Sequence, residues 1–391
     1  MKHLKDLFLL DPAVVYLNHG SFGACPKPIF ESFQAWQEEL EWEPVQFITK
    51  KAVTALLEAK QALAPFIGCA AEDFVFVQNP TAAVNQIVKS LDLKPGDEVL
   101  TTNHEYGAMD RTWRFYAKKK GFRYVQQHIQ LPVTSREQML EDFWKGLTPN
   151  TRVVFISHMS SSTALIFPVR EICEKAKALG LMCIVDGAHV PGHIPLNLSE
   201  LQPDFYTGTL HKWMLAPKGS SFLYVDKKHQ AELDPLIVSW GYESDMPGDS
   251  TFLDYNEVQG TRDISAFLAT PAVMAFLQEN NWSAVSDACK AMIRKHYPAF
   301  CDLLHTKPIC PVSDVFLGQM CSIPIRTTRP TALKETLYAK YRIEIPIMQK
   351  QDEVYLRISM QAYNDEAELQ QLREALVEIV EQTDLLALSG V

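Results

Sequence analysis

Short apolar runs alternate with amphipathic segments between about residues 70 and 210. Runs such as 74–77 have the length of buried strands, whereas Val84, Ile87 and Val88 recur at the spacing of one helical face. Strands are predicted at 74–77, 99–102, 122–129, 153–158, 182–186, 204–209 and 220–225. Helices are predicted after Pro80 and at 109–119, 136–147 and 168–179. This alternation predicts an α/β fold, with a mostly parallel sheet flanked by helices and ligands bound at strand ends.

The pattern changes beyond about residue 260, where helices and strands no longer alternate regularly. Helices are predicted at 267–278, 284–304 and 365–381, and strands at 319–325, 342–347 and 354–360. This arrangement is typical of a smaller α+β domain. We therefore predict a large domain over 16–260 and a small domain made of 1–15 and 261–391, because the first 15 residues are too few to fold alone.

Composition and charge exclude several classes of partner. The chain has 391 residues, of which 47% are apolar and 21% charged, which is the balance of a globular protein. Its formal charge of −10 disfavours binding to nucleic acid or to an anionic membrane. No apolar run approaches the roughly 20 residues needed to cross a bilayer, and the N-terminus lacks a secretory signal. We expect a cytoplasmic protein with reduced, mostly buried cysteines, because its 8 cysteines show no CxxC or His-paired spacing.

Lys212 is the first candidate for chemistry. It follows a β-rich run, DFYTGTLH, and precedes the apolar residues Trp213 and Met214. A lysine at a strand end can form a Schiff base when burial or a neighbouring cation lowers its pKa, whereas a surface lysine stays protonated. A solvated surface residue is the plainer interpretation of Lys212 taken alone, and its apolar neighbours favour a semi-buried site.

Asp186 ends the apolar strand LMCIV and is placed by it at the ligand edge of the sheet. It is either a turn-capping residue or a buried carboxylate that keeps a pyridine nitrogen protonated. His189 and His193 have the four-residue spacing of metal ligands. However, Pro191 and Gly192 prevent a regular helix between them and no third ligand is evident, so no metal is predicted.

Thr81, Ala82 and Ala83 open the helix that follows the strand at 74–77. Backbone N–H groups at a helix start can hold a phosphate dianion, and a threonine N-cap explains the same residues. The chain has neither a GxGxxG nor a GxxxxGK[ST] motif, so a dinucleotide-dependent oxidoreductase has little support.

Several collinear motifs combine these elements into a resemblance that covers nearly the whole chain. They are YLNHGSFGACP (16–26), NHEYGA (103–108), SHMSSSTALIFPV (157–169), VDGAHVPG (185–192), TGTLHKW (207–213), VQGTRD (258–263) and YLRISMQAYN (355–364). The sequence resembles the class V aminotransferase and cysteine desulfurase superfamily of fold-type I enzymes, in its isopenicillin N epimerase-like branch. The resemblance implies pyridoxal 5′-phosphate (PLP) as cofactor and a seven-stranded, mostly parallel sheet.

The same resemblance assigns roles around the cofactor. It makes Lys212 the Schiff-base lysine, Asp186 the partner of the pyridine nitrogen and Tyr106 the ring stacked on the cofactor. It places His189 and Ser161 near the cofactor 3-oxygen. The phosphate-binding residues implied are Thr81, Ala82, Ala83, Thr209, His211 and, from a second subunit, Thr261. A homodimer is therefore expected.

Substrate contacts follow from the C-terminal and N-terminal motifs. Arg357 lies on a strand where it alternates with Leu356 and Ile358, and a guanidinium fork there would bind a substrate α-carboxylate in bidentate fashion. A surface salt bridge is the plainer interpretation without the resemblance. Asn18 and His19 are predicted to line the substrate entrance, with 240–245 and Arg262 also near the side-chain pocket.

The resemblance predicts a PLP enzyme acting at Cα or Cβ of an amino acid, as an epimerase or a carbon–sulfur lyase. A class V aminotransferase is the alternative, and a non-catalytic binding protein is a weaker one because the lysine, aspartate and arginine are all present. Epimerisation needs a second acid, for which Tyr106 and His19 are the candidates. Persulfide-forming desulfuration is not expected, because 322–357 contains no cysteine and Cys321 falls in a predicted strand.

Overall fold

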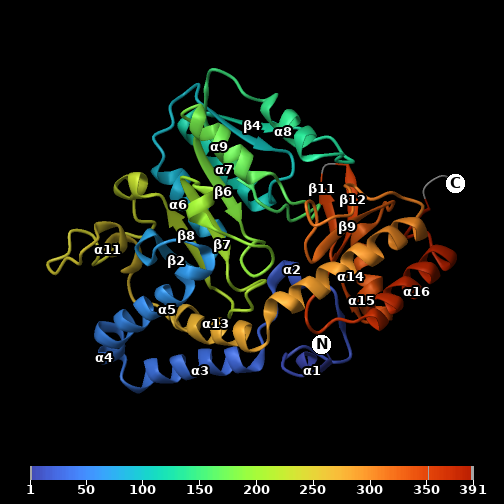
Figure 1. Ribbon diagram of the computed structural model, residues 1–391, viewed down its shortest axis with the longest axis horizontal. Helices are drawn as coiled ribbons and strands as arrows, with labels where there is room; N and C mark the ends of the chain where they lie inside the picture. Colours follow the sequence, from blue (N-terminus) through green and yellow to red (C-terminus); the bar gives the residue numbers. More distant parts are fainter. Residues whose placement is uncertain (1, 351, 389–391) are drawn as a thin grey trace.

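A seven-stranded sheet forms the centre of the computed structural model, which describes residues 2–350 and 352–388 (Figure 1). Its strands are β2 (Phe74–Val77), β3 (Glu98–Thr102), β4 (Arg123–Gln127), β5 (Thr151–Ser157), β6 (Met182–Gly187), β7 (Phe205–Thr209) and β8 (Ser221–Val225). They lie in the order β2-β8-β7-β6-β5-β3-β4. β8 runs antiparallel to both neighbours and the other adjacent pairs are parallel. The predicted α/β fold with a mostly parallel sheet is confirmed.

Helices cover both faces of this sheet. The helices of this part of the chain are α3 (Lys27–Trp42), α4 (Pro44–Gln46), α5 (Ala52–Ile67), α6 (Pro80–Ser90), α7 (Gly107–Lys120), α8 (Arg136–Trp144), α9 (Val169–Ala178), α10 (Leu198–Leu201), α11 (Thr251–Glu257), α12 (Ser265–Leu268) and α13 (Thr270–Glu279). Successive strand residues point to opposite faces. Phe74 and Phe76 therefore join the apolar core that includes α5 and α9, whereas Val75 and Val77 join the core that includes α6 and α7.

The C-terminal part forms a second, smaller unit, coloured orange to red in Figure 1. Its elements are α14 (Trp282–Leu303), β9 (Met320–Ile325), α15 (Pro330–Tyr341), β10 (Ile343–Glu344), β11 (Ile347–Lys350), β12 (Glu353–Ser359) and α16 (Glu366–Gln382). β11, β12 and β9 form an antiparallel sheet. The predicted strand 342–347 is wrong as one element: it divides into β10 and β11 around Pro346, which has no N–H to donate to a ladder.

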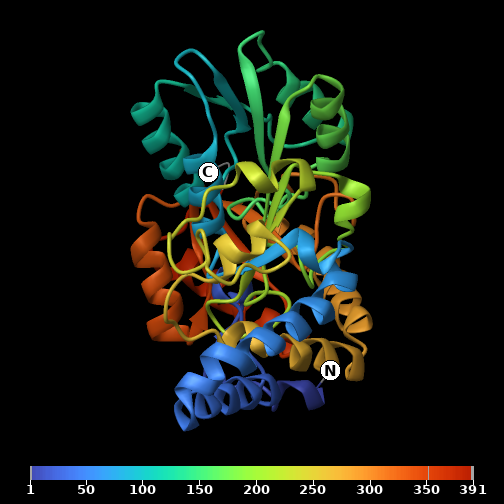
Figure 2. The same ribbon diagram turned by 90° about the vertical axis from the view of Figure 1, so that its left-hand side faces the viewer.

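The N-terminal segment joins this smaller unit. It contains α1 (Lys2–Lys5), β1 (Val15–Tyr16) and α2 (His19–Phe22). β1 pairs in parallel with β10, and the ring of Phe8 lies 4.9 Å from that of Tyr363. α12 and α13 lie beside α3 and α5 (Figures 1 and 2). The domain limits 16–260 and 1–15 with 261–391 stay a prediction.

The carboxyl ends of three central strands meet at one sheet edge. Ser157 ends β5 and lies opposite Asp186 in β6, while Thr209 ends β7. Parallel strands bring their carboxyl ends together, so residues far apart in sequence gather there. No helix in the described part of the chain is long and apolar enough to cross a membrane.

Candidate active site

A cavity of about 280 Å³ opens at this sheet edge. Strands β5, β6 and β7 supply its floor, and the starts of α6 and α7 and the end of α2 supply its walls. Its lining residues are Ser21, Phe22, Asn79, Pro80, Thr81, Tyr106, Met109, Ser157, Met159, Ser161, Asp186, Ala188, His189, Thr209, His211 and Lys212. The structure thus brings together eight of the predicted site residues: Thr81, Tyr106, Ser161, Asp186, His189, Thr209, His211 and Lys212.

Lys212 projects into the cavity from the turn after β7. The pKa of its amine is lowered to about 8, first by burial and then by the Arg357 guanidinium, while the Asp186 carboxylate opposes both effects. The N-terminal segment packs on the backbone of the same turn, since a Cβ at Gly23 would lie 2.2 Å from the carbonyl oxygen of His211. A substantial fraction of the Lys212 amine is therefore neutral near pH 8, as a nucleophile or base requires.

His189 contacts the lysine through a defined ring nitrogen. Its Nε2 lies 3.2 Å from Lys212 Nζ, and its Nδ1 accepts a hydrogen bond from the indole N–H of Trp213 at 3.3 Å. An indole nitrogen only donates, so His189 in its neutral form carries its proton on Nε2. Burial holds the pKa of His189 well below its usual value, which keeps the ring neutral. His189 is thus a fixed hydrogen-bond donor toward the cavity.

Both ring nitrogens of His193 make hydrogen bonds within the protein. Its Nδ1 donates to the carbonyl oxygen of His189 at 2.8 Å, and its Nε2 accepts from the backbone N–H of Gln319. Its ring stacks on Trp213 with centroids 3.9 Å apart. Within residues 2–350 and 352–388, no group of three or more His, Cys, Asp or Glu side chains is arranged to hold a metal ion.

One buried carboxyl group, that of Asp186, lines the cavity, and a second, that of Glu105, lies behind it. Asp186 accepts the backbone N–H of Ala188 at 3.0 Å, and its pKa is raised because burial outweighs that hydrogen bond and the nearby Lys212 amine. Glu105 accepts the backbone N–H and the hydroxyl of Ser157, at 2.9 and 2.6 Å. Burial raises the pKa of Glu105 to about 7. Ser157 at the end of β5 lies opposite Asp186 in the adjacent strand β6. By binding Ser157, Glu105 therefore fixes the strand end next to Asp186.

The start of α6 contributes fewer groups to the cavity than predicted. Asn79, not Thr81, caps this helix, because the Asn79 Oδ1 accepts the N–H of Ala82 at 2.9 Å. The N–H of Ala83 donates to the Asn79 carbonyl oxygen, so both alanine amides are already used. Neither alanine lines the cavity, and Thr81 is the predicted residue of this helix start that does.

Two further side chains face Thr81 from β7 and the turn after it. The buried hydroxyl of Thr209 has no hydrogen-bond partner among the described residues. His211 donates from Nδ1 to the carbonyl oxygen of Ser220 at 2.9 Å, which leaves its Nε2 for a ligand. Burial lowers the pKa of His211 to about 4. A phosphate dianion would reverse this shift and draw a proton onto Nε2.

Arg357 lies fully buried beside the cavity. Its Nη1 donates to the carbonyl oxygen of Ser161 at 2.6 Å, and its Nη2 donates to the hydroxyl of Ser21 at 2.8 Å. Burial lowers the pKa of its guanidinium to about 10, and the opposing groups are the phenols of Tyr16 and Tyr106 rather than carboxylates. Its Nε has no partner in the described part of the chain. A buried cation without an anionic partner is suited to bind an anionic ligand.

Four predicted residues lie elsewhere or reach the cavity only partly. Tyr106 lines the cavity with 48% of its surface exposed, and Thr261 is exposed and lines no part of this cavity. Asn18 lines an adjoining cavity. His19 is fully buried: its Nδ1 accepts from the hydroxyl of Tyr363 at 2.8 Å and its Nε2 donates to the Lys212 carbonyl oxygen at 3.0 Å. The structure does not bring His19 to either cavity.

Trp213, Glu105 and Ser157 are site residues that the sequence analysis did not assign. Each had a visible signal, since Trp213 follows the lysine directly, Glu105 lies within NHEYGA and Ser157 opens SHMSSSTALIFPV. The cavity as described has no cysteine in its lining, and Cys321 is buried in β9.

The cavity fits a planar, phosphate-bearing aldehyde. The unpartnered hydroxyl of Thr209 and the free Nε2 of His211, the Asp186 carboxylate buried on β6 and the Lys212 amine all line this one cavity. These groups define an enzyme that holds an aldehyde cofactor on a lysine at the edge of a parallel sheet.

The chain belongs to the aminotransferase class-V family, whose profile matches residues 43–372. The resemblance found in the sequence is confirmed, and the protein is a PLP-dependent enzyme. A small-molecule amino-acid substrate is consistent with this family.

Comparison with individual proteins shows which members of this class of enzyme the chain is similar to. The chain is 32% identical to the isopenicillin N epimerase of Amycolatopsis lactamdurans over 390 residues, covering 96% of this chain and 97% of that one. It is 25% identical to an L-cysteine desulfhydrase of Arabidopsis thaliana over 405 residues, covering 94% and 88%. The apo structure of a cysteine desulfurase from Thermococcus onnurineus superposes with a TM-score of 0.82 at 20% identity, over 97% and 98% of the chains. These similarities support the predicted epimerase or carbon–sulfur lyase chemistry.

Proposed function

We propose that this enzyme removes the Cα proton of an amino acid and then releases a sulfur substituent from Cβ, as a carbon–sulfur lyase. The observation that carries the proposal is the meeting of two groups at one cavity. One is the Lys212 amine, whose pKa of about 8 makes it a usable base. The other is the Arg357 guanidinium, which is buried without a carboxylate partner in the described part of the chain. Elimination needs one base, and Lys212 is that base.

The predicted site residues that line the cavity have roles in this proposal. Thr81, Thr209 and His211 would hold the cofactor phosphate, and Tyr106 would cover a ring face. Asp186 would keep the ring nitrogen protonated, and His189 and Ser161 would bind the ring hydroxyl. The cofactor, when bound, supplies the ring that accepts the electron pair left at Cα.

The chain's own residues then move one proton. Arg357 orients the substrate by its α-carboxylate, so that the Cα–H bond faces Lys212. Nζ takes the Cα proton as that bond breaks. The Cβ–S bond breaks next as the electron pair from Cα forms a double bond to Cβ; the sulfur leaves with the Cβ–S electron pair, and Nζ returns its proton to the departing thiolate. The lysine amine ends neutral, as it began.

Epimerisation is the second candidate, favoured by the 32% identity to an isopenicillin N epimerase. It requires an acid on the face opposite Lys212. Of the two candidates, His19 has both ring nitrogens engaged by Tyr363 and the Lys212 carbonyl, whereas the Tyr106 phenol lines the cavity. Tyr106 is therefore the acid we assign to this second candidate.

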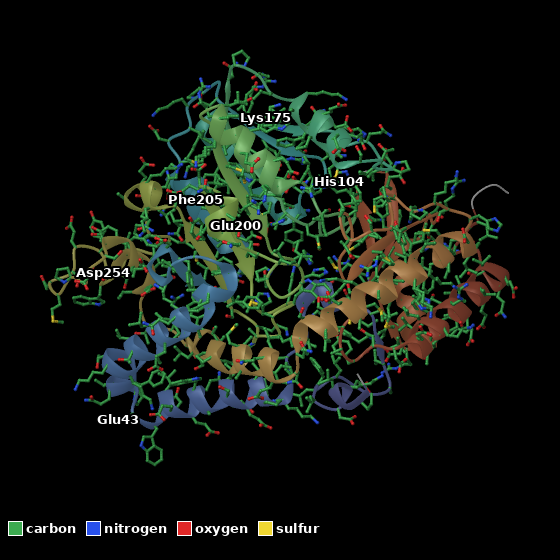
Figure 3. All side chains as sticks on the ribbon, in the orientation of Figure 1. Glu43, His104, Lys175, Glu200, Phe205 and Asp254 are labelled. Atoms are coloured by element: carbon green, nitrogen blue, oxygen red, sulfur yellow. The ribbon has the colours of Figure 1, made fainter. Side chains whose placement is uncertain are left out.

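A homodimer is part of the proposal. Several large apolar side chains are exposed, among them Trp42 and Trp240 with 87% and 84% of their surface exposed. Glu43 and Asp254, labelled in Figure 3, mark the two segments involved. Thr261 is exposed at the end of the second segment, where a partner subunit's cavity would use it. Sedimentation of the loaded protein measures the assembly.

The test combines a spectrum with a product analysis. The loaded protein is expected to show a visible absorption band that borohydride abolishes, and Lys212→Ala is expected to lose both the band and on the order of 10²-fold or more in turnover. Incubation with cysteine thioethers should yield pyruvate and ammonia. Solvent deuterium at Cα with inverted product would favour epimerisation instead. A colourless protein, or amino-group transfer to a keto acid, would overturn the proposal.

A further inference from the structure

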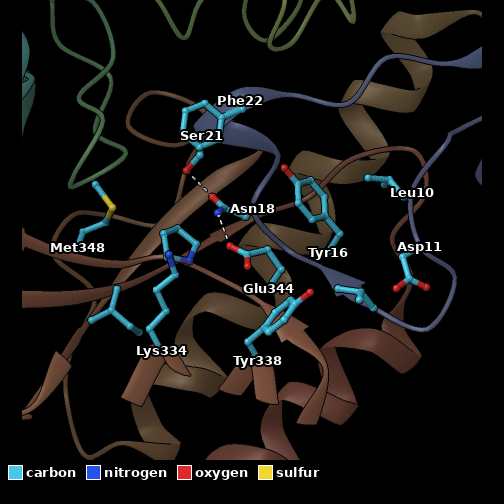
Figure 4. Close-up of a pocket in the computed structure, with 13 residues that line it drawn as sticks. Leu10, Asp11, Tyr16, Asn18, Ser21, Phe22, Lys334, Tyr338, Glu344 and Met348 are labelled. Carbon is cyan, nitrogen blue, oxygen red and sulfur yellow. Dashed lines mark hydrogen bonds between the residues drawn. The ribbon is translucent and has the colours of Figure 1, made fainter. Parts of the chain in front are cut away.

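A second cavity adjoins the cofactor cavity and has no role in the chemistry described above. Its volume is about 620 Å³, and it shares Ser21 and Phe22 with the cofactor cavity (Figure 4). The N-terminal segment, α15 and the residues around β10 and β11 form its walls. Its lining residues are Leu10, Asp11, Val14, Tyr16, Asn18, Ser21, Phe22, Lys334, Tyr338, Glu344, Pro346, Ile347 and Met348.

A directed chain of hydrogen bonds connects the two cavities. Arg357 Nη2 donates to the Ser21 hydroxyl at 2.8 Å, and that hydroxyl donates to Asn18 Oδ1. The Asn18 amide then donates to Glu344 Oε1 at 2.8 Å, as the dashed lines in Figure 4 show. Every bond runs the same way, so each polarises the next. This series of hydrogen bonds begins at a guanidinium beside the cofactor cavity and ends at a carboxylate in the second cavity.

Glu344 is the carboxylate of the second cavity that has no cationic partner among residues 2–350 and 352–388. Asp11, also in its lining, is paired with Arg342 at 3.1 Å. Lys334 is exposed on α15 and makes no ion pair with Glu344 in the part of the chain that the structure describes. Glu344 accepts the Asn18 amide on Oε1, which leaves Oε2 with unused acceptor capacity.

The second cavity is also too large for a short side chain. A thiol such as that of cysteine occupies a small part of the 280 Å³ cavity, and the adjoining 620 Å³ lies within the range of about 300 to 1,000 Å³ typical of small-molecule pockets. Leu10, Val14, Ile347 and Met348 give it apolar walls that suit a methylene chain. Tyr16 places a phenol near Glu344, and burial raises its pKa to about 12, so the hydroxyl stays protonated.

We propose that the second cavity binds the far end of the substrate side chain, and that the substrates are α-amino acids whose side chain ends in a cationic N–H donor. The α-carboxylate lies at Arg357 and the side-chain cation at Glu344, the two ends of the hydrogen-bonded chain. This inference rests on the proposed function, which puts the amino acid at Arg357. It adds a substrate class that the reaction itself does not require.

The test compares two thioethers of equal length in the PLP-loaded protein. S-(2-aminoethyl)-L-cysteine and S-propyl-L-cysteine differ only by a terminal ammonium in place of a methyl group. The measured quantity is the concentration that gives half of the change in the visible absorption spectrum. We expect the aminoethyl compound to bind about tenfold more tightly, because a charged hydrogen bond to a carboxylate is lost in the propyl compound.

Two variants locate the effect. Glu344→Gln keeps an acceptor for Asn18 and nearly the same volume but removes the charge, and it should abolish the tenfold preference. Glu335→Gln, on the exposed side of α15, removes the same charge outside the cavity and should keep the preference. Thermal unfolding checks that both variants fold, and the wild-type comparison alone tests the preference if one does not.

The outcomes separate the two proposals. Equal binding of both thioethers to a coloured, responsive wild-type protein would overturn this inference and leave the proposed function intact. So would a preference that survives in Glu344→Gln. A wild-type protein without a borohydride-sensitive band, which responds to neither thioether nor to L-cysteine, would overturn the proposed function and this inference with it.

Discussion

The two neighbouring cavities are built in different ways. The cofactor cavity takes most of its lining from 79–212, where strand ends and helix starts converge at one edge of the central sheet. The second cavity is formed by 10–22 and 334–348, which are joined through the pairing of β1 with β10. In the proposals above, the reaction chemistry depends on the central sheet and the selectivity on two distant chain segments. Arg357 lies beside the cofactor cavity and is linked to the second cavity through Ser21.

Removing the Arg357 guanidinium should weaken ligand binding at both cavities. Arg357→Met removes the guanidinium while keeping an unbranched side chain, and it should raise the half-saturating concentration of L-cysteine and of long thioethers alike by about 10- to 100-fold, because charged hydrogen bonds to the α-carboxylate are lost. Spectral titration of the loaded variant measures this. If only the long thioethers were weakened, Arg357 would belong to the second cavity alone.

The pH dependence of cofactor capture sharpens the cofactor side of the comparison. The neutral Lys212 amine is the nucleophile, and its pKa of about 8 is below the ordinary 10.5. The rate at which apo protein captures PLP should therefore rise with pH, about tenfold per unit below pH 8, and level above it. Asp186 raises the pKa of Lys212, so Asp186→Asn should move the midpoint to lower pH. Stopped-flow absorbance measures the rate, and a midpoint near 10 would contradict the described burial of the amine.

The smallest expected effect concerns the tautomer of His189. Trp213→Phe removes the indole N–H that His189 Nδ1 accepts, at a cost of about 1 kcal/mol, or a few-fold in cofactor affinity. Nitrogen NMR of the histidine ring should then show a mixture of tautomers in place of the Nε2–H form. Trp282→Phe is the matched control, because the Trp282 indole nitrogen is buried without a partner among the described residues. An unchanged His189 spectrum in Trp213→Phe would show that another group sets the tautomer.

Sequence reasoning located the cofactor cavity because its residues sit where short apolar runs end. Asp186 and Lys212 follow such runs directly, and the strand-end rule places them together. The seven strands were predicted for the same reason. By contrast, 342–347 was predicted as one strand, since an apolar pattern does not show that Pro346 divides it between two sheets.

The second cavity and the state of His19 could not be predicted in this way. They depend on which distant segment pairs with the N-terminus, and the pairing of β1 with β10 has no signature in either short strand. His19 lies in a motif next to Asn18, yet one residue lines a cavity and the other is buried against Tyr363 and Lys212. Adjacent positions at the start of a short helix point in different directions, and only the tertiary packing decides which of them reaches a cavity.

The pairing of Val15 with Ile343 also constrains the order in which the parts of the molecule can fold. During synthesis the N-terminal segment leaves the ribosome long before its partner strand is translated, so the central sheet has the opportunity to form first. The entrance for the substrate side chain is then completed last, when the final fifth of the chain closes over the first twenty residues. A ribosome-bound intermediate stalled after residue 330 would thus already have its lysine in place while still lacking the acidic end of its substrate pocket.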